Sequence, residues 1–285
     1  MTHMTSTSRL PRAGALALAF ACAWQPAHAL ETTLTAKYNA RLSYLPINFA
    51  TGKLTATLPE SGRYSLDFGA QGIGFAMSGK AVGTVVPDGL SPVSSAIDTL
   101  DSSEKRSIRL ALSRGRVRRD VVTPPVPYRR DRVPITDEHR VNVTDPISAL
   151  VMPVSVKGAP LDAGNCKRTL RIFEGTERFN IQLSYLRTER VKTPVGYEGQ
   201  AIVCRASYRA VAGHRAVQGV RDMEANQTME AWLVPVEGSG MLVPWKISMG
   251  TKIGTMVIEA SEFTARTVGT AQANVVDSFE LRKSR

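Results

Sequence analysis

Residues able to act as a general base or a nucleophile are scarce in this chain. Only two histidines follow residue 28, namely His139 in a charged segment and His214 beside Gly213. No Gly-x-Ser-x-Gly segment is present, the motif that places a nucleophilic serine on a sharp turn. We therefore expect both histidines to be exposed or locally hydrogen-bonded, and the sequence predicts no catalytic residue.

Two weak patterns can be nominated as hydrolase sites. Ser102 and Lys105 form a Ser-x-x-Lys arrangement, but its usual partners Ser-Asp-Asn and Lys-Thr-Gly are absent. Glu259 and Glu262 could form a carboxylate pair that cleaves glycosidic bonds, a role that depends on their separation. We treat the first pattern as a chance match, and sequence alone cannot test the second. A hydrolase or transferase that acts on envelope polymers is the alternative function, with a site that no sequence motif reveals.

The sequence predicts no metal site and no cofactor. His139 and His214 are far apart and lack the His-x-x-x-His spacing of zinc sites. Gly72-Ile73-Gly74 is followed by Met77, where a dinucleotide-binding fingerprint requires glycine.

The first 29 residues have the organisation of a secretory signal peptide. Arg9 and Arg12 precede an apolar stretch of about 12 residues, and the small-x-small triplet Ala27-His28-Ala29 follows it. That stretch is too short to span a bilayer as a helix, which takes roughly 20 residues. We expect cleavage after Ala29, with Cys22 as an alternative acylation site. The mature chain, residues 30–285, is then a single periplasmic domain without a transmembrane segment.

Cys166 and Cys204 are the two cysteines of the expected mature chain. An even pair in an oxidising compartment favours a disulfide. The spacing differs from the Cys-x-x-Cys of redox pairs, and a tetrahedral metal site would need two further ligands. The sequence therefore predicts a structural disulfide between them.

Four arginines are candidates for contact with an anionic surface. The chain carries a formal net charge of +11, and Arg116 and Arg118 lie on one face of a predicted strand. Arg129 and Arg130 follow in a proline-rich segment. Such charges commonly only solvate the outer face of a sheet. The alternative is contact with phospholipid headgroups or lipopolysaccharide phosphates, which arginine binds in bidentate fashion. Nucleic acid is excluded as a partner, because the periplasm lacks it and no aromatic residues are interleaved with the arginines.

Period-2 alternation of apolar and polar residues recurs along the chain, and helical periodicity is scarce. Residues 178–185 alternate cleanly, and the links at 113–116, 174–175 and 237–240 are short enough to join antiparallel neighbours. The pattern predicts a mostly all-β fold of about a dozen antiparallel strands. A sheet of that size tends to curl into a barrel- or spiral-like form, which hides its edges.

Three segments interrupt the predicted strands. Residues 123–134 are proline-rich and predict a surface loop. Asp145 and Pro146 predict a short helix over residues 146–151, with Asp145 as the cap and Pro146 at the first helical position. The apolar content of that helix indicates that it plugs or flanks the sheet. Residues 210–227 predict a second irregular or weakly helical stretch.

Several short motifs are spread over most of the mature chain. They are Tyr44-Leu45-Pro46-Ile47, Gly62-x-Tyr64, Asp145-Pro146-x-Ser148-Ala149-Leu150, Leu170-x-Ile172-Phe173-Glu174-Gly175 after Cys166, and Pro244-Trp245-Lys246-Ile247 after Cys204. Together they resemble an exported bacterial family known as domain-of-unknown-function family 3108. Glu174-Gly175 stands where that family would have Asp-Gly. The resemblance implies export and a β-rich fold, and it brings no catalytic residues with it.

These observations favour a non-enzymatic cell-envelope protein. We expect a curved sheet that holds an apolar ligand, or that meets a partner or an anionic surface at the periplasmic face of a membrane. An outer-membrane barrel is a third hypothesis, disfavoured because residues 230–235 do not alternate.

Overall fold

The computed structural model describes residues 29–45, 47–87, 89–102, 104–155 and 158–270. Residues 1–28, nearly the whole predicted signal peptide, lie outside the described residues. Ala29, after which cleavage is expected, is the first residue of the first strand. All structural statements below concern the described residues.

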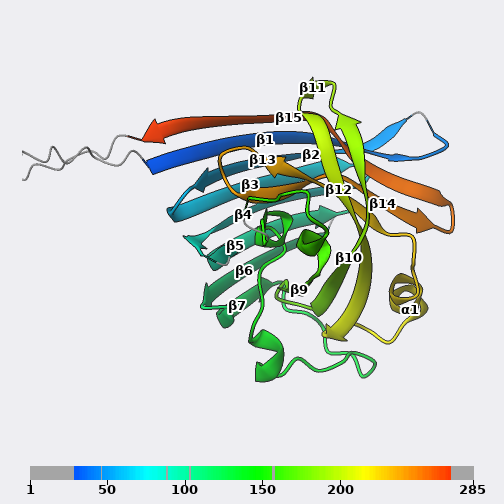
Figure 1. Cartoon of the computed structure of the whole chain (residues 1–285). Coiled ribbons are helices and arrows are strands. Elements are labelled where there is room, and N and C mark those ends of the chain that lie inside the picture. The colour runs from blue at the N-terminus through cyan, green and yellow to red at the C-terminus, as the bar shows by residue number, and fades with distance from the viewer. Residues whose placement is uncertain (1–28, 46, 88, 103, 156–157, 271–285) are drawn as a thin grey trace, which may run out of the picture. The chain divides into compact units, whose positions relative to one another are not determined.

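The N-terminal half of the sheet is a meander in which every strand pairs with the next (Figure 1). Its alternation follows the sequence: Ile108, Leu110 and Leu112 are buried, and Arg109 and Ala111 between them are exposed. The strands are β1 (Ala29–Leu42), β2 (Asn48–Pro59), β3 (Gly62–Gly72), β4 (Phe75–Val86), β5 (Gly89–Asp101), β6 (Glu104–Ser113) and β7 (Arg116–Thr123).

The C-terminal half continues the same sheet in the order β15-β14-β13-β12-β10-β9. It joins the first half where β15 pairs with β1, from Ala29 opposite Thr270 to Leu42 opposite Met256. The strands of this half are β8 (Met152–Pro153), β9 (Arg168–Phe173), β10 (Arg178–Lys192), β11 (Val195–Gly196), β12 (Glu198–Ala212), β13 (Glu230–Val236), β14 (Met241–Thr251) and β15 (Gly254–Thr270).

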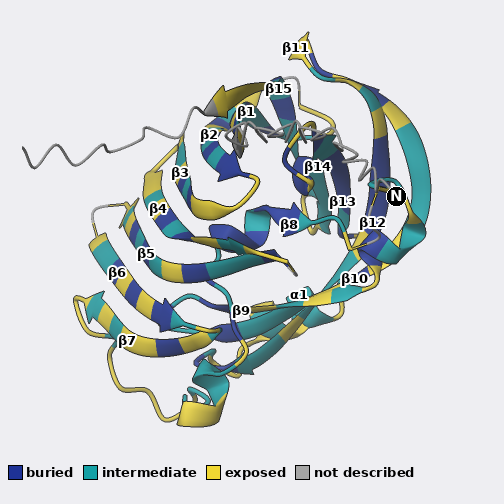
Figure 2. Ribbon diagram, turned by 60° about the vertical axis from the view of Figure 1, so that its left-hand side comes forward, coloured by how far each residue is buried: buried dark blue, intermediate teal, exposed yellow. Residues whose placement is uncertain are grey.

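The predicted fold class is confirmed. The described residues form one 15-stranded sheet that is antiparallel except where β11 pairs with β15, and it curves around its own interior (Figure 2). Helices are few in the described chain. They are α1 (Gln218–Glu224) and the 3-10 helices η1 (Asp137–Arg140), η2 (Ser148–Leu150) and η3 (Ala163–Cys166).

Strand pairing does not close the sheet, and its two edges are β7 and β9. Residues 131–144, which we call the strap, join the parts on either side of the gap by backbone hydrogen bonds. Val133 N donates to His214 O at 2.9 Å, Val143 N donates to Gly115 O at 2.9 Å, and Thr144 N donates to Arg171 O at 2.8 Å. The strap thus covers edges that would otherwise be open to pairing with another chain.

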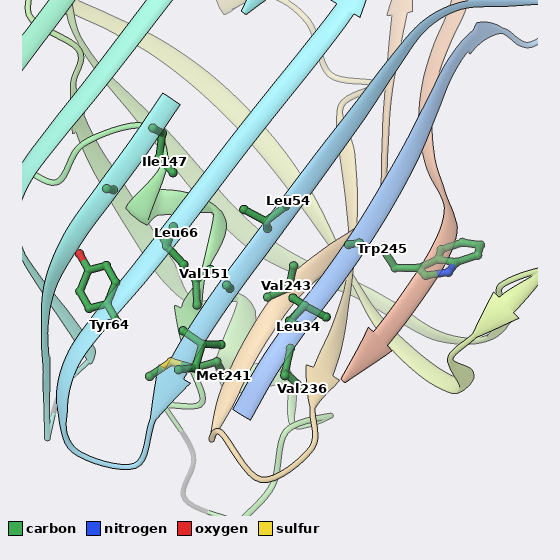
Figure 3. Close-up of a cluster of buried hydrophobic side chains, with 14 of the residues drawn as sticks. Leu34, Leu54, Tyr64, Leu66, Ile147, Val151, Val236, Met241, Val243 and Trp245 are labelled. Carbon is green, nitrogen blue, oxygen red and sulfur yellow. The ribbon is translucent and has the colours of Figure 1, made fainter. Parts of the chain in front are cut away.

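Residues 145–153, which we call the plug, follow the strap into the interior of the sheet. Ile147 packs so closely on β4 that a Cβ atom added to Gly79 would lie 2.5 Å from its Cδ1 atom. Glycine at position 79 therefore makes room for the plug. The plug joins a buried apolar cluster drawn from both halves of the sheet (Figure 3), which includes Leu34, Leu54, Leu66, Val151, Val236, Met241 and Val243.

The plug differs from the predicted helix over residues 146–151. Only Ser148–Leu150 forms a 3-10 helix, because Met152 and Pro153 are extended and pair with β14. Oδ1 of Asp145 accepts the backbone amides of Ile147 and Ser148, both at 3.0 Å. Burial raises the pKa of Asp145, an effect that these hydrogen bonds partly offset.

Candidate functional site: an apolar cavity inside the sheet

A cavity of about 310 Å³ lies between the concave face of the N-terminal strands, the plug and strands β14 and β15. Its walls are almost entirely apolar, although seven different elements contribute to them. The lining consists of Tyr38, Ala40, Phe49, Ala50, Thr51, Gly52, Leu54, Phe68, Ala70, Phe75, Leu150, Pro244, Lys246, Ile247, Met256 and Ile258.

Small residues in neighbouring strands create this space. Ala40 pairs with Ala50, and Gly52 pairs with Ala70. Cross-strand partners point to the same face of a sheet, so these four positions leave a shallow area between larger side chains. The cavity is therefore encoded by residues that are distant in sequence and adjacent in register.

Two backbone segments cover this area. Leu150 reaches it from the plug, and Pro244 and Ile247 reach it from β14. The hydroxyl of Tyr38 donates to the carbonyl of Pro244 at 2.7 Å, which ties β1 to β14 at the cavity wall. Burial raises the pKa of Tyr38, so its phenol stays neutral and its one proton is used in this bond. The hydroxyl of Tyr38 at the cavity wall thus has a hydrogen-bond partner, and the remaining walls are almost entirely apolar.

A broader groove of about 920 Å³ crosses the same strands on their other face. Lys37 and Lys53, which pair with each other, are next in sequence to the cavity residues Tyr38 and Gly52. Successive strand residues face opposite sides, so the groove is outside the curve. Asp98 is the one carboxylate among the described residues that line it, and hydrogen bonds from Ser107 and Arg109 lower its pKa. The groove does not bring two acids together.

The two histidine residues take part in local hydrogen bonds at the strap. Nδ1 of His139 accepts the backbone amide of Thr136 at 3.0 Å, within a turn of the strap. His214 lies opposite the strap, with its carbonyl bonded to Val133 N. No group of three or more His, Cys, Asp or Glu residues that could hold a metal ion occurs in the described part of the chain.

The carboxylates nominated from sequence are engaged in ion pairs across the β1–β15 pair. Glu259 lies 2.9 Å from Arg41, and Glu262 lies 2.6 Å from Lys37. Neither residue of the carboxylate pair points to a polar cleft shared with the other. This arrangement gives the hydrolase alternative no support.

The four arginines do not lie at the cavity. Arg116 and Arg118 are exposed on the edge strand β7, and Arg129 and Arg130 are exposed in the loop before the strap. None of the four is within 4 Å of a carboxylate among the described residues. Charge on an edge strand also prevents pairing with another chain, which is a structural reason for Arg116 and Arg118.

Cys166 and Cys204 are joined in a disulfide with a Cα–Cα distance of 5.6 Å, as their parity predicts. Both residues are fully buried. The bond fastens η3, which follows the plug in the chain, to β12. The disulfide therefore holds the segment between the plug and β9 to the sheet.

Sequence reasoning predicted an apolar interior but did not identify the residues of the cavity. Ala40, Ala50, Gly52 and Ala70 carry no chemical signature. A signal does exist in the sequence, because small residues occupy alternate positions on β2 (Ala50, Gly52) and β3 (Ala70, Gly72), and Ala40 of β1 pairs with Ala50. It becomes readable only once the register of those strands is known.

Comparisons with known proteins give a family and a similar solved structure. No helix among the described residues is long and apolar enough to cross a membrane. No curated protein matches the chain. The crystal structure of a β-barrel-like protein of domain-of-unknown-function family 1849 from Brucella abortus is similar, with a TM-score of 0.44 and 10% identity over 82% of this chain and 98% of that one. Residues 37–261 match the protein family of unknown function DUF3108, and the chain belongs to that family.

Proposed function

We propose that this is an exported, non-enzymatic protein of the cell envelope that holds an apolar ligand, such as an acyl chain of a lipid, in its cavity. In this proposal the leader of residues 1–29 is removed and residues 30–285 form one periplasmic domain. A buried disulfide is compatible with an oxidising compartment. The leader organisation of the sequence supports the same location.

The apolar cavity is the observation that carries the proposal. Its volume of about 310 Å³ lies at the lower end of the range of about 300–1,000 Å³ for ligand sites. Apolar cavities in proteins stay dry and take up apolar molecules, because their walls offer water no hydrogen-bond partners. A small apolar molecule or part of one lipid chain therefore fits this site better than a polar substrate.

The substitution Gly52→Leu tests the proposal directly. A Cβ atom at position 52 would lie 3.5 Å or more from its nearest neighbours, so the backbone accepts a side chain there. The new side chain points to the face of Tyr38 and Ala70 and fills the cavity. We expect binding of the fluorescent probe N-phenyl-1-naphthylamine, and its displacement by palmitate, to weaken at least about tenfold, equivalent to about 1.4 kcal/mol.

Gly69→Leu is the matched control. A Cβ atom at position 69 would meet only Met77 O, at 4.0 Å, and it points to the outer face beside Lys53. Its binding of the probe should equal that of the wild type. The proposal is wrong if the wild-type protein does not bind the probe, or if both leucine variants bind it equally well.

Contact with an anionic surface through the basic residues is a second candidate. It is favoured by the exposure of Arg116, Arg118, Arg129 and Arg130 and by their lack of carboxylate partners among the described residues. Such a contact is compatible with a ligand in the cavity, because the arginines and the cavity lie on different parts of the sheet.

A further inference from the structure

Five large apolar side chains are exposed together at one end of the sheet. They come from the connections β1–β2, β3–β4 and β14–β15, which antiparallel pairing places at the same end of the strands. We call them the apolar rim: Tyr44 (61% exposed), Leu45 (41%), Ile47 (66%), Ile73 (87%) and Ile253 (67%).

Contacts between the connections make the rim continuous. Ser43 N donates to Thr255 O at 2.8 Å, and the ring of Tyr44 packs against Gly254, where an added Cβ atom would lie 2.4 Å from it. Ile73 N donates to Phe49 O at 3.3 Å. The three tips are thus held side by side, whereas isolated exposed apolar residues are common and carry no meaning.

The rim also lacks charge. Residues 42–51, 71–79 and 247–258 contain a single charged residue, Lys252, although 21% of the chain is charged and about six would be expected. Connections at the other end of the sheet do carry charges, among them Glu60, Arg114 and Glu237. Asp101 and Glu104, on either side of the β5–β6 connection, border the rim on its side toward β7, where Asp101 pairs with Phe75. The connections at the two ends of the sheet therefore differ in charge.

The rim leads into the cavity. Phe49 and Phe75 line the cavity and lie beside the tips that carry Ile47 and Ile73, and Met256 lies beside the tip that carries Ile253. Apolar side chains therefore continue from the rim to the wall of the cavity.

We infer that the apolar rim inserts into the surface of a lipid bilayer. The three tips themselves contain no acidic residue, and their one lysine, Lys252, forms an ion pair with Asp222 of α1 at 2.7 Å. Apolar tips of this kind suit the boundary between headgroups and acyl chains. The continuity of the rim with an apolar cavity favours a bilayer over a protein partner, because the bilayer is itself a source of acyl chains. The inference extends the proposed function, and it has a separate readout.

Vesicle cosedimentation tests the inference. The rim variant combines Ile47→Asp, Ile73→Asp and Ile253→Asp, and the control combines Val93→Asp, Val195→Asp and Val268→Asp. The three control positions are 50–56% exposed and lie outside the rim. Both variants introduce three aspartates, so the change in net charge is the same. Vesicles of phosphatidylcholine, with and without phosphatidylglycerol, are used at low and high salt.

We expect the wild type and the control to pellet with both kinds of vesicle at both salt concentrations, because apolar insertion is not screened by ions. The rim variant should lose this binding at least about tenfold and keep the unfolding midpoint of the control. If the triple variant does not fold, Ile73→Asp alone, at the most exposed position of the rim, should still weaken binding.

Three results would overturn the inference. The wild type could fail to pellet with either kind of vesicle. It could pellet only with anionic vesicles at low salt, or the rim variant could pellet as well as the control. Gly52→Leu separates this inference from the proposed function, since it should lose the probe and keep vesicle binding.

Discussion

The phenol oxygen of Tyr64 lies 2.8 Å from the hydroxyl oxygen of Ser148, and both side chains are buried. Tyr64 belongs to β3, and Ser148 belongs to the plug, 84 residues later. Tyr64 also packs over Gly83, where an added Cβ atom would lie 2.6 Å from its ring. This polar contact thus ties the plug to β3, in addition to the pairing of Met152 and Pro153 with β14.

Tyr64→Phe and Ser148→Ala should each lower the free energy of unfolding by about 0.5–1.5 kcal/mol, the usual net value of one hydrogen bond. Because the two groups bond to each other, the double variant should lose less than the sum of the single variants, by at least about 0.5 kcal/mol. Urea denaturation of the four proteins measures this coupling. Additive losses would mean that the contact contributes nothing to stability.

Asp145→Asn should change how stability depends on pH. Burial raises the pKa of Asp145, so the unfolded chain releases this proton at a lower pH than the folded one. The free energy of unfolding of the wild type, measured against that of the asparagine variant, is therefore highest below the unfolded pKa of about 3.9, and it falls as pH rises through the folded pKa. Denaturation at pH 3, 5 and 7 should show the wild-type curve falling toward or below that of the variant. Parallel curves would contradict the prediction.

Gly175→Ala should lower the free energy of unfolding by about 2–4 kcal/mol. Gly175 has a φ of +102°, and an added Cβ atom would lie 2.6 Å from Cγ2 of Ile108 on β6. Gly62→Ala is the control, because Gly62 has a φ of +99° with no atom within 4 Å of an added Cβ. Its loss should reflect backbone strain alone and be smaller. Equal losses would show that the turn does not pack on β6.

Replacing Cys166 or Cys204 by Ser should lower stability by about 2–5 kcal/mol, as for other native disulfides. The bond closes a loop of 38 residues, for which chain entropy alone predicts about 4 kcal/mol. Thiol titration of denatured, unreduced protein that consists of residues 30–285 should find no free thiol. Two free thiols would contradict the predicted bond.

Reversal of Arg116, Arg118, Arg129 and Arg130 to Glu should abolish the extra affinity for anionic over neutral vesicles at low salt. Basic residues near an anionic leaflet contribute about 1 kcal/mol each, and salt screens that attraction. The fold should be unchanged, because all four side chains are exposed. If the quadruple variant and the wild type show the same preference, these arginines only solvate the surface and protect the edge strand.

The strands could be predicted because their signal is local. Residues 178–185 alternate and lie in β10, and the short links at 113–116 and 237–240 are turns between antiparallel neighbours. The plug was recognised from its apolar content and from the order Asp145-Pro146. Its helical form was overestimated, because the pairing of Met152 with Leu242 of β14 is a long-range contact.

The cavity could not be predicted, for a related reason. Gly52 is near Tyr38 and Ala70 only through the register of three strands. The strap likewise has no sequence signal, since residues 131–144 bond to partners as far away as His214. Patterns along one strand report which face is buried, and they do not report which strands meet across the interior.

The pairing of β1 with β15 has a consequence for the order in which this protein can fold. Partners in this seam are more than 200 positions apart, whereas the hairpins on either side of it are local. Closing so long a loop is entropically costly, and folding slows as contacts become less local. The two halves of the sheet should therefore form first and join last. In a chain that ended before β15, the two halves would not be joined by strand pairing. β1 would then be an unpaired edge strand, to which a second copy could add a strand.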